Sequence, residues 1–110
     1  MAKGGMDLLR GTLDLLVLKT LRGGNSHGYA IAKAINAVTD GVLSVEEGSL
    51  YPALYRMEKR GWIRSDWGVT DTKRRAKFYE LTSSGRDHLQ AEQSNWGEFS
   101  SAVEKVLEAN

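Results

Sequence analysis

The side chains best suited to bind a ligand are cations concentrated in one fifth of the chain. Residues 56–77 contain eight basic and three acidic residues, a net charge of +5, whereas the whole chain of 110 residues carries +1. The densest part is Lys73-Arg74-Arg75, followed by Lys77. Clustered lysine and arginine side chains neutralise phosphate charges and release condensed counterions. The block therefore predicts a polyanionic partner, although by charge alone a solvated loop fits it equally well.

A second set of candidate binding residues lies on a predicted helix at the start of this block. At 100° per residue, one helix face is apolar and predicts a core contact: Leu50, Ala53, Leu54, Met57 and Gly61. The opposite face carries aromatic, proline and cationic side chains: Tyr51, Pro52, Tyr55, Arg56 and Lys59. This mixture is unusual for a face that only meets water, and it indicates a binding surface.

Two helices are expected before this one. The 3-4-7 spacing of apolar residues predicts the first over about 8–21. The second has Ser26 as its expected N-cap, with Ile31, Ile35 and Val38 on one face. The third helix has the form of a capping box from Ser44 to Glu47. Pro52 leaves two alternatives open: the helix kinks there, or 45–48 form a separate turn and Ser49 caps the main helix.

After Gly61 the period of the pattern changes to two, which predicts strands over 62–67 and 76–81 joined by a polar hairpin loop. A long helix is then expected, capped by Thr82 or Ser83. Its apolar residues alternate at spacings of three and four, as in a heptad seam: Leu89, Trp96, Phe99, Val103 and Val106. At about 38 Å, this helix would outreach the small domain before it and leave its distal apolar residues in water.

Three helices followed by a hairpin with a cationic tip is the order of a winged helix-turn-helix. We therefore expect a mainly α fold with a small β-hairpin, in which 1–82 bind DNA and 83–110 form a C-terminal dimerisation helix. The third helix would enter the major groove and the hairpin would meet phosphates, and two copies would match a palindromic operator. The residues expected at double-stranded DNA are Tyr29, Ser49, Tyr51, Pro52, Arg56, Lys73, Arg74, Arg75 and Lys77.

Some of these residues have a plainer alternative. Tyr51 would otherwise pack at the helix edge, and Arg56 would pair with a nearby acid. Tyr29 fits an ordinary tyrosine at the edge of the core as well as it fits a phosphate contact.

Three stretches of the chain resemble the PadR family of transcriptional regulators: 28–31, 47–63 with its Gly-Ser-Leu-Tyr-Pro-Ala-Leu run, and 75–82. The length resembles the short subfamily, which ends in a single dimerisation helix. The resemblance implies a repressor of a nearby gene, released by a small molecule or another signal. Family wings commonly carry glycine or proline near the tip, whereas residues 70–75 here contain neither.

The resemblance also implies a homodimer formed by the last helix with help from the first. The residues expected in this interface are Leu9, Leu13, Leu89, Trp96, Phe99, Val103 and Val106. Two interpretations of Trp96 stay open: it packs between subunits, or, as multidrug-sensing relatives suggest, it stacks on a planar apolar inducer.

Other function classes find little support in the residues. There is no cysteine, no histidine pair at ligand spacing and no nucleophile or phosphate-loop motif, so no enzyme, metal or cofactor is expected. His27 and His88 are expected at the surface. Without an apolar run of about 20 residues or a secretory signal, a cytoplasmic protein with no membrane contact is expected. Two alternatives remain: a winged-helix module that binds protein, and a ligand-binding dimer with incidental DNA affinity.

Overall fold

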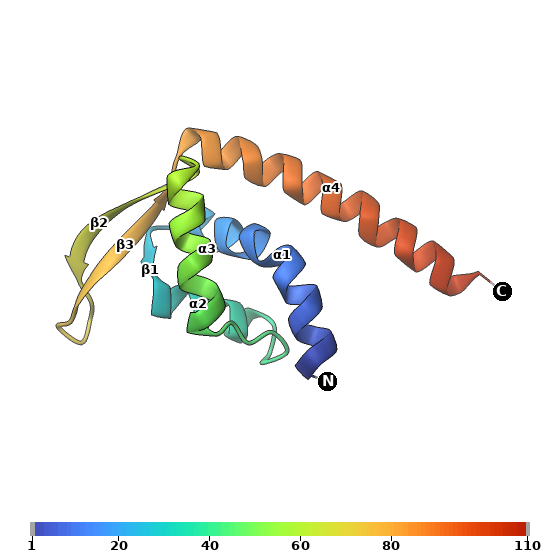
Figure 1. Cartoon of the computed structure of the whole chain (residues 1–110), viewed down its shortest axis with the longest axis horizontal. Coiled ribbons are helices and arrows are strands. Elements are labelled where there is room, and N and C mark those ends of the chain that lie inside the picture. The colour runs from blue at the N-terminus through green and yellow to red at the C-terminus, as the bar shows by residue number, and fades with distance from the viewer. Residues whose placement is uncertain (1, 110) are drawn as a thin grey trace.

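The computed structural model describes residues 2–109, with side chains from residue 11 onward. A small antiparallel sheet accompanies four helices, which confirms the expected mainly α class (Figure 1). The β2–β3 hairpin leaves the body at one end, and the last helix leaves it toward the other. The elements in chain order are α1 (Ala2–Arg22), β1 (Ser26–His27), α2 (Gly28–Val38), α3 (Glu47–Lys59), β2 (Ile63–Val69), β3 (Arg75–Leu81) and α4 (Ser83–Glu108).

One apolar core joins the first three helices to the base of the hairpin and the first turns of α4. The predicted inner face of α3 is confirmed, because Leu50, Ala53, Leu54 and Met57 are buried. Gly61 lies beyond the end of α3 and is exposed, contrary to expectation. The remaining core side chains come from α1, α2, the strands and α4: Leu13, Val17, Leu18, Leu21, Ile31, Ile35, Ile63, Tyr79, Leu81 and Leu89.

The expected start of α2 is wrong by one residue, and so is part of its apolar face. Ser26 and His27 form strand β1, and His27 is the N-cap, with its Nδ1 accepting a hydrogen bond from the amide of Ala30 at 3.4 Å. Ser26 is displaced from the cap because the chain leaves α1 in extended form and pairs with β3. Val38 is 82% exposed, since α2 ends there, past the edge of the core.

Of the two alternatives for Pro52, the one in which Ser49 caps the main helix is wrong. Glu46 is the N-cap and its side chain makes no capping hydrogen bond, so the expected capping box at Ser44 is wrong. The helix begins at Glu47, which leaves Pro52 inside it and Ser49 in its first turn. Proline has no amide hydrogen, so the carbonyl of Gly48 loses its usual partner four residues on. Gly48 and Pro52 are both exposed, so water can hydrogen-bond to the carbonyl oxygen of Gly48.

The sheet has the order β1-β3-β2. The hairpin runs in register from the pair Ile63↔Leu81 at its base to Val69↔Arg75 at its tip. Both strands reach further toward the tip than the sequence pattern indicated. The short strand β1 was not predicted, and it ties the start of α2 to the middle of the hairpin.

Thr82 decides how α4 leaves the sheet. Its hydroxyl accepts a hydrogen bond from the amide of Gly85 at 3.0 Å and donates to the carbonyl of Gly61 at 2.6 Å, so Thr82 rather than Ser83 caps the helix. Gly85 is required here, because a Cβ at this position would lie 2.0 Å from the carbonyl oxygen of Trp62. Within residues 2–109, no helix is both long and apolar enough to cross a bilayer.

The residues expected in a dimer interface fall into two groups. Leu13 and Leu89 are buried in the core of their own chain, so the expectation that they meet a partner is not supported. Trp96, Phe99, Val103 and Val106 lie on the projecting part of α4 and are exposed. The side chain of Leu9 lies outside the described residues.

Candidate nucleic-acid interface

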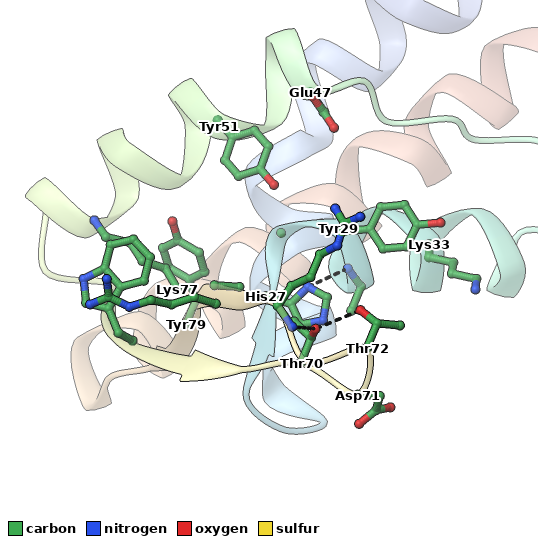
Figure 2. Close-up of a pocket in the computed structure, with 16 residues that line it drawn as sticks. His27, Tyr29, Lys33, Glu47, Tyr51, Thr70, Asp71, Thr72, Lys77 and Tyr79 are labelled. Atoms are coloured by element: carbon green, nitrogen blue, oxygen red, sulfur yellow. Dashed lines mark hydrogen bonds between the residues drawn. The ribbon is translucent and has the colours of Figure 1, made fainter.

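A groove of about 900 Å³ lies between the starts of α2 and α3 and the β2–β3 hairpin. In Figure 2, Tyr51 projects from α3 toward the start of α2, and Lys77 and Tyr79 project from β3. Five of the nine residues expected at DNA line this groove: Tyr29, Tyr51, Arg74, Arg75 and Lys77. The tyrosine side of α3 and the cationic cluster of the hairpin therefore share one surface.

The position of Tyr51 depends on the absence of a side chain at Gly28. A Cβ on Gly28 would lie 2.6 Å from the Tyr51 hydroxyl oxygen and 2.8 Å from the ring. The ring therefore packs directly on the backbone at the start of α2, although Tyr51 is still 44% exposed. This contact fixes the aromatic face of α3 relative to the groove.

Beneath Tyr51, a polar cluster connects α3 to the sheet. Ser65 donates a hydrogen bond to Glu58 Oε2 at 2.6 Å, and Ser65 is paired in register with Tyr79. Burial raises the pKa of the Tyr79 hydroxyl above its usual 10.0, and the nearby Glu58 carboxylate and Tyr51 add to this effect. Tyr79 is therefore held in its neutral form at the floor of the groove.

The tip of the hairpin is a tight turn built without glycine. The amide of Thr70 donates to the carbonyl of Arg74 at 2.8 Å, and the amide of Lys73 donates to the carbonyl of Thr70 at 2.9 Å. Lys73 has φ +67°, the left-handed conformation that glycine usually provides in three-residue hairpin loops. The Thr70 hydroxyl accepts a hydrogen bond from the amide of Arg74 at 3.1 Å, which supports the turn.

The geometry has the layout of a winged helix, and comparisons with known proteins identify the family. Residues 17–91 match the model of the transcriptional regulator PadR-like family. The chain belongs to the PadR-like family. It is thereby placed among DNA-binding transcriptional regulators rather than enzymes.

Solved structures of PadR-like and related regulators superpose closely on this chain. A transcriptional regulator from Clostridium thermocellum is 34% identical, with a TM-score of 0.82 over 90% of this chain and 96% of its own. A PadR family regulator from Eggerthella lenta is 33% identical, with a TM-score of 0.81 over 99% and 93%. A PadR-like regulator from Bacillus cereus is 28% identical, with a TM-score of 0.81 over 94% and 99%.

The other four residues expected at DNA do not line the groove. Ser49 and Pro52 are exposed on α3, and Lys73 lies at the exposed hairpin tip. Arg56 forms an ion pair with Asp14 of α1, with Nη2 and Oδ1 2.5 Å apart. This is the plainer alternative considered for Arg56, and it ties the outer side of α3 to α1. Whether these four meet DNA stays a prediction of the sequence.

Two residues that were not expected at DNA from the sequence also line the groove. Trp67 lines the groove from β2, and Lys33 lines it from α2 with its Nζ 5.9 Å from the centre of the Tyr29 ring. Trp67 ends the predicted strand 62–67, but its partner on the other strand depends on the hairpin register. Sequence spacing alone does not give that register.

The two histidines were expected at the surface, and both are partly exposed while packing against another ring. His27 lines the groove, and its ring meets Phe78 edge-on with 5.2 Å between centroids. His88 stacks on Trp62 at 3.6 Å, where α4 passes the start of β2. Among the side chains described, no group of three or more His, Asp or Glu residues is placed to hold a metal ion.

Proposed function

We propose that this chain is a sequence-specific regulator that binds palindromic duplex DNA as a homodimer and represses transcription until a small molecule or another signal releases it. The observation that carries the proposal is the groove, in which tyrosines from α2 and α3 meet the cations of the hairpin. In this proposal residues 1–82 form the DNA-binding domain and residues 83–110 the dimerisation helix.

The first turns of α3 are proposed to read bases in the major groove, which is about 12 Å wide and admits one helix. Ser49, Tyr51 and Pro52 lie on its exposed side. The hairpin cations would then meet phosphates beside the helix and fix its register on the duplex. Arg56 would join this contact only after leaving Asp14.

Dimerisation is proposed to occur through the projecting part of α4. Trp96, Phe99, Val103 and Val106 keep the 3-4 spacing of a helical seam and are exposed in the single chain. Covering such a stripe with the same stripe of a second copy removes apolar surface from water on both sides. The paired domains would then reach two half-sites about one helical turn of DNA apart.

Release by a signal is proposed to act near the same helix. The Trp96 and Phe99 rings lie 6.1 Å apart, centre to centre, and both are exposed. In a dimer, these rings and their symmetry mates could stack on a planar apolar molecule. Titrating planar dyes into a variant that lacks Trp62 and Trp67 tests this, since Trp96 is then the sole tryptophan; unchanged fluorescence argues against it.

Footprinting on the DNA upstream of the protein's own gene, followed by fluorescence anisotropy across a salt series, tests DNA binding. Each neutralised phosphate contributes about −0.9 to the slope of log affinity against log salt. Replacing Arg74, Arg75 and Lys77 by alanine should weaken binding and flatten this slope. The matched control replaces three exposed cations outside the groove, Lys19, Arg22 and Arg86, and should change little. Equal losses in both variants, or a slope near zero for the wild type, would refute the proposal.

A further inference from the structure

The Trp67 ring lies close to two cations on the groove side of the hairpin. The centre of its ring is 4.4 Å from the guanidinium carbon of Arg75 and 5.8 Å from Nζ of Lys77. Lys77 is its cross-strand partner, and Arg75 stands two residues earlier on the same strand face. All three side chains line the groove. The indole and the two cations therefore form one cluster.

The fold itself does not explain an indole at this position. On the same face of the hairpin, Ile63 and Leu81 are buried at the base and belong to the core. Trp67 lies further toward the tip, is 55% exposed, and is absent from the core and from the apolar residues packed against it. A large apolar ring left in water contributes little to folding. The contacts of this ring with Arg75 and Lys77 are therefore the ones to explain.

We propose that Trp67 is a positioning residue for DNA binding: its indole holds Arg75 and Lys77 in the groove so that their donors face a DNA phosphate. This inference rests on the proposed DNA-binding function and deepens it. The phosphate backbone is the partner that the cluster fits, because the two cations on the aromatic ring present adjacent positive charges and, among the described side chains, neither forms an ion pair with a carboxylate.

Stacking suits this task for a geometric reason. A guanidinium that lies on a ring keeps its in-plane N–H donors free, so Arg75 can donate to phosphate oxygens while it stays on the indole. Arginine and lysine side chains otherwise lose considerable rotamer freedom when they bind. The ring also attracts both cations through its negative face, which offsets their mutual repulsion. Trp67 thus orders the two charges before DNA arrives.

The test compares Trp67→Leu and Trp67→Gln, which remove the aromatic face, with Trp67→Phe, which keeps one. DNA affinity of the full-length protein is measured by anisotropy with the footprinted duplex, and thermal unfolding confirms that each variant is folded. The leucine and glutamine variants should bind about 3- to 10-fold more weakly, and the phenylalanine variant should stay within about 2-fold of wild type. The salt slope should become shallower only in the first two.

A double-variant comparison separates positioning from direct contact. In a background of Arg75→Ala and Lys77→Ala, removing the Trp67 ring should cause no further loss, because there is nothing left to hold. An equal loss in that background would mean that Trp67 touches DNA or supports the fold by itself, and would overturn the inference. Unchanged binding by folded Trp67→Leu and Trp67→Gln would overturn it as well, while DNA binding by the wild type would stand. A wild type that binds no duplex would refute the proposed function and this inference together.

Discussion

The groove and the projecting part of α4 both expose aromatic side chains, but they hold them differently. In the groove, Tyr51 packs on the backbone of Gly28, and the Trp67 ring lies close to two cations. On α4, Trp96 is 43% and Phe99 62% exposed, and their ring contact with each other is on the same helix. The groove is thus already ordered in one chain, whereas the apolar stripe of α4 is suited to a partner surface.

This difference indicates that the two regions serve different functions, DNA recognition in the groove and association on α4. Polar and cationic groups ordered in advance lower the cost of binding a charged partner and set its register. Apolar side chains in water instead favour association, at about 1.5–3 kcal/mol for each large side chain that becomes fully buried. We therefore expect changes in the groove to alter DNA recognition, and changes on α4 to act through the oligomeric state.

The largest effect is expected from charged residues in the exposed apolar stripe of α4. Replacing Trp96 and Phe99 by glutamate should give a folded monomer, because four buried carboxylates would oppose dimer formation. DNA affinity should fall at least about 100-fold, since each half-site would be bound without the help of the other. Sedimentation and anisotropy measure the two effects.

The matched control for this change is Val38→Glu, which adds a charge at another exposed apolar residue. Val38→Glu should leave the oligomeric state and the DNA affinity as in the wild type. A doubly substituted protein that remains dimeric would contradict the role given to α4.

The next largest effect is expected at the contact between Gly28 and Tyr51. Gly28→Ala places a methyl group against the tyrosine ring, which must swing outward. Because Tyr51 is partly exposed and can move, the free energy of unfolding should fall by only about 1 kcal/mol. DNA affinity should fall about 10-fold, as for loss of one good contact in each site. Urea unfolding and anisotropy check the two numbers.

Two further variants test whether the steric overlap with Tyr51 causes the loss of stability in Gly28→Ala. Gly48→Ala on α3 meets no atom within 4 Å and should stabilise the protein slightly, as alanine favours helix. In a Tyr51→Ala background the stability cost of Gly28→Ala should disappear. If that cost persists, the overlap with Tyr51 is not its origin.

Periodicity predicted those parts of the fold in which one face of an element meets the core. The inner face of α3 and the change of period after it follow from spacing alone, and all four helices were expected. Periodicity does not say what covers a face. Leu89 and Trp96 share one predicted seam, yet Leu89 is buried by its own chain and Trp96 is not.

Other features depend on contacts between residues far apart in sequence. Strand β1 has two residues, too few to show any period, and exists because β3 lies beside it. The ion pair of Arg56 with Asp14 joins residues 42 positions apart. The neighbours of Trp67 follow from the hairpin register, which a pattern of alternating residues leaves undetermined. For this reason composition predicted the cations of the site but not the ring that holds two of them.

A smaller effect is expected at the hairpin tip, where backbone and charge can be separated. Lys73→Asn keeps a residue that tolerates the left-handed conformation and removes the charge. Its free energy of unfolding should stay within about 0.5 kcal/mol of wild type. If Lys73 meets a phosphate, the salt slope of the asparagine variant should become shallower by about 0.9 for each subunit.

Lys73→Val tests the backbone and should destabilise the protein, because a β-branched residue is strained at φ +67°. Equal stability of the asparagine and valine variants would contradict the strain assigned to this turn.

The smallest effect is expected from the floor of the groove at alkaline pH. The pKa of Tyr79 is raised in the folded protein by burial and then by Glu58 and Tyr51, so the unfolded chain loses this proton at a lower pH than the folded chain. The folded state therefore binds the proton more tightly, and stability should fall as the pH rises past 10.0, the usual pKa of tyrosine. Tyr79→Phe should lack this part of the decline, whereas Tyr55→Phe, which alters an exposed ring on α3, should follow the wild type. Urea unfolding between about pH 8 and 11 measures the difference. A parallel decline in wild type and Tyr79→Phe would contradict the raised pKa assigned to the Tyr79 hydroxyl.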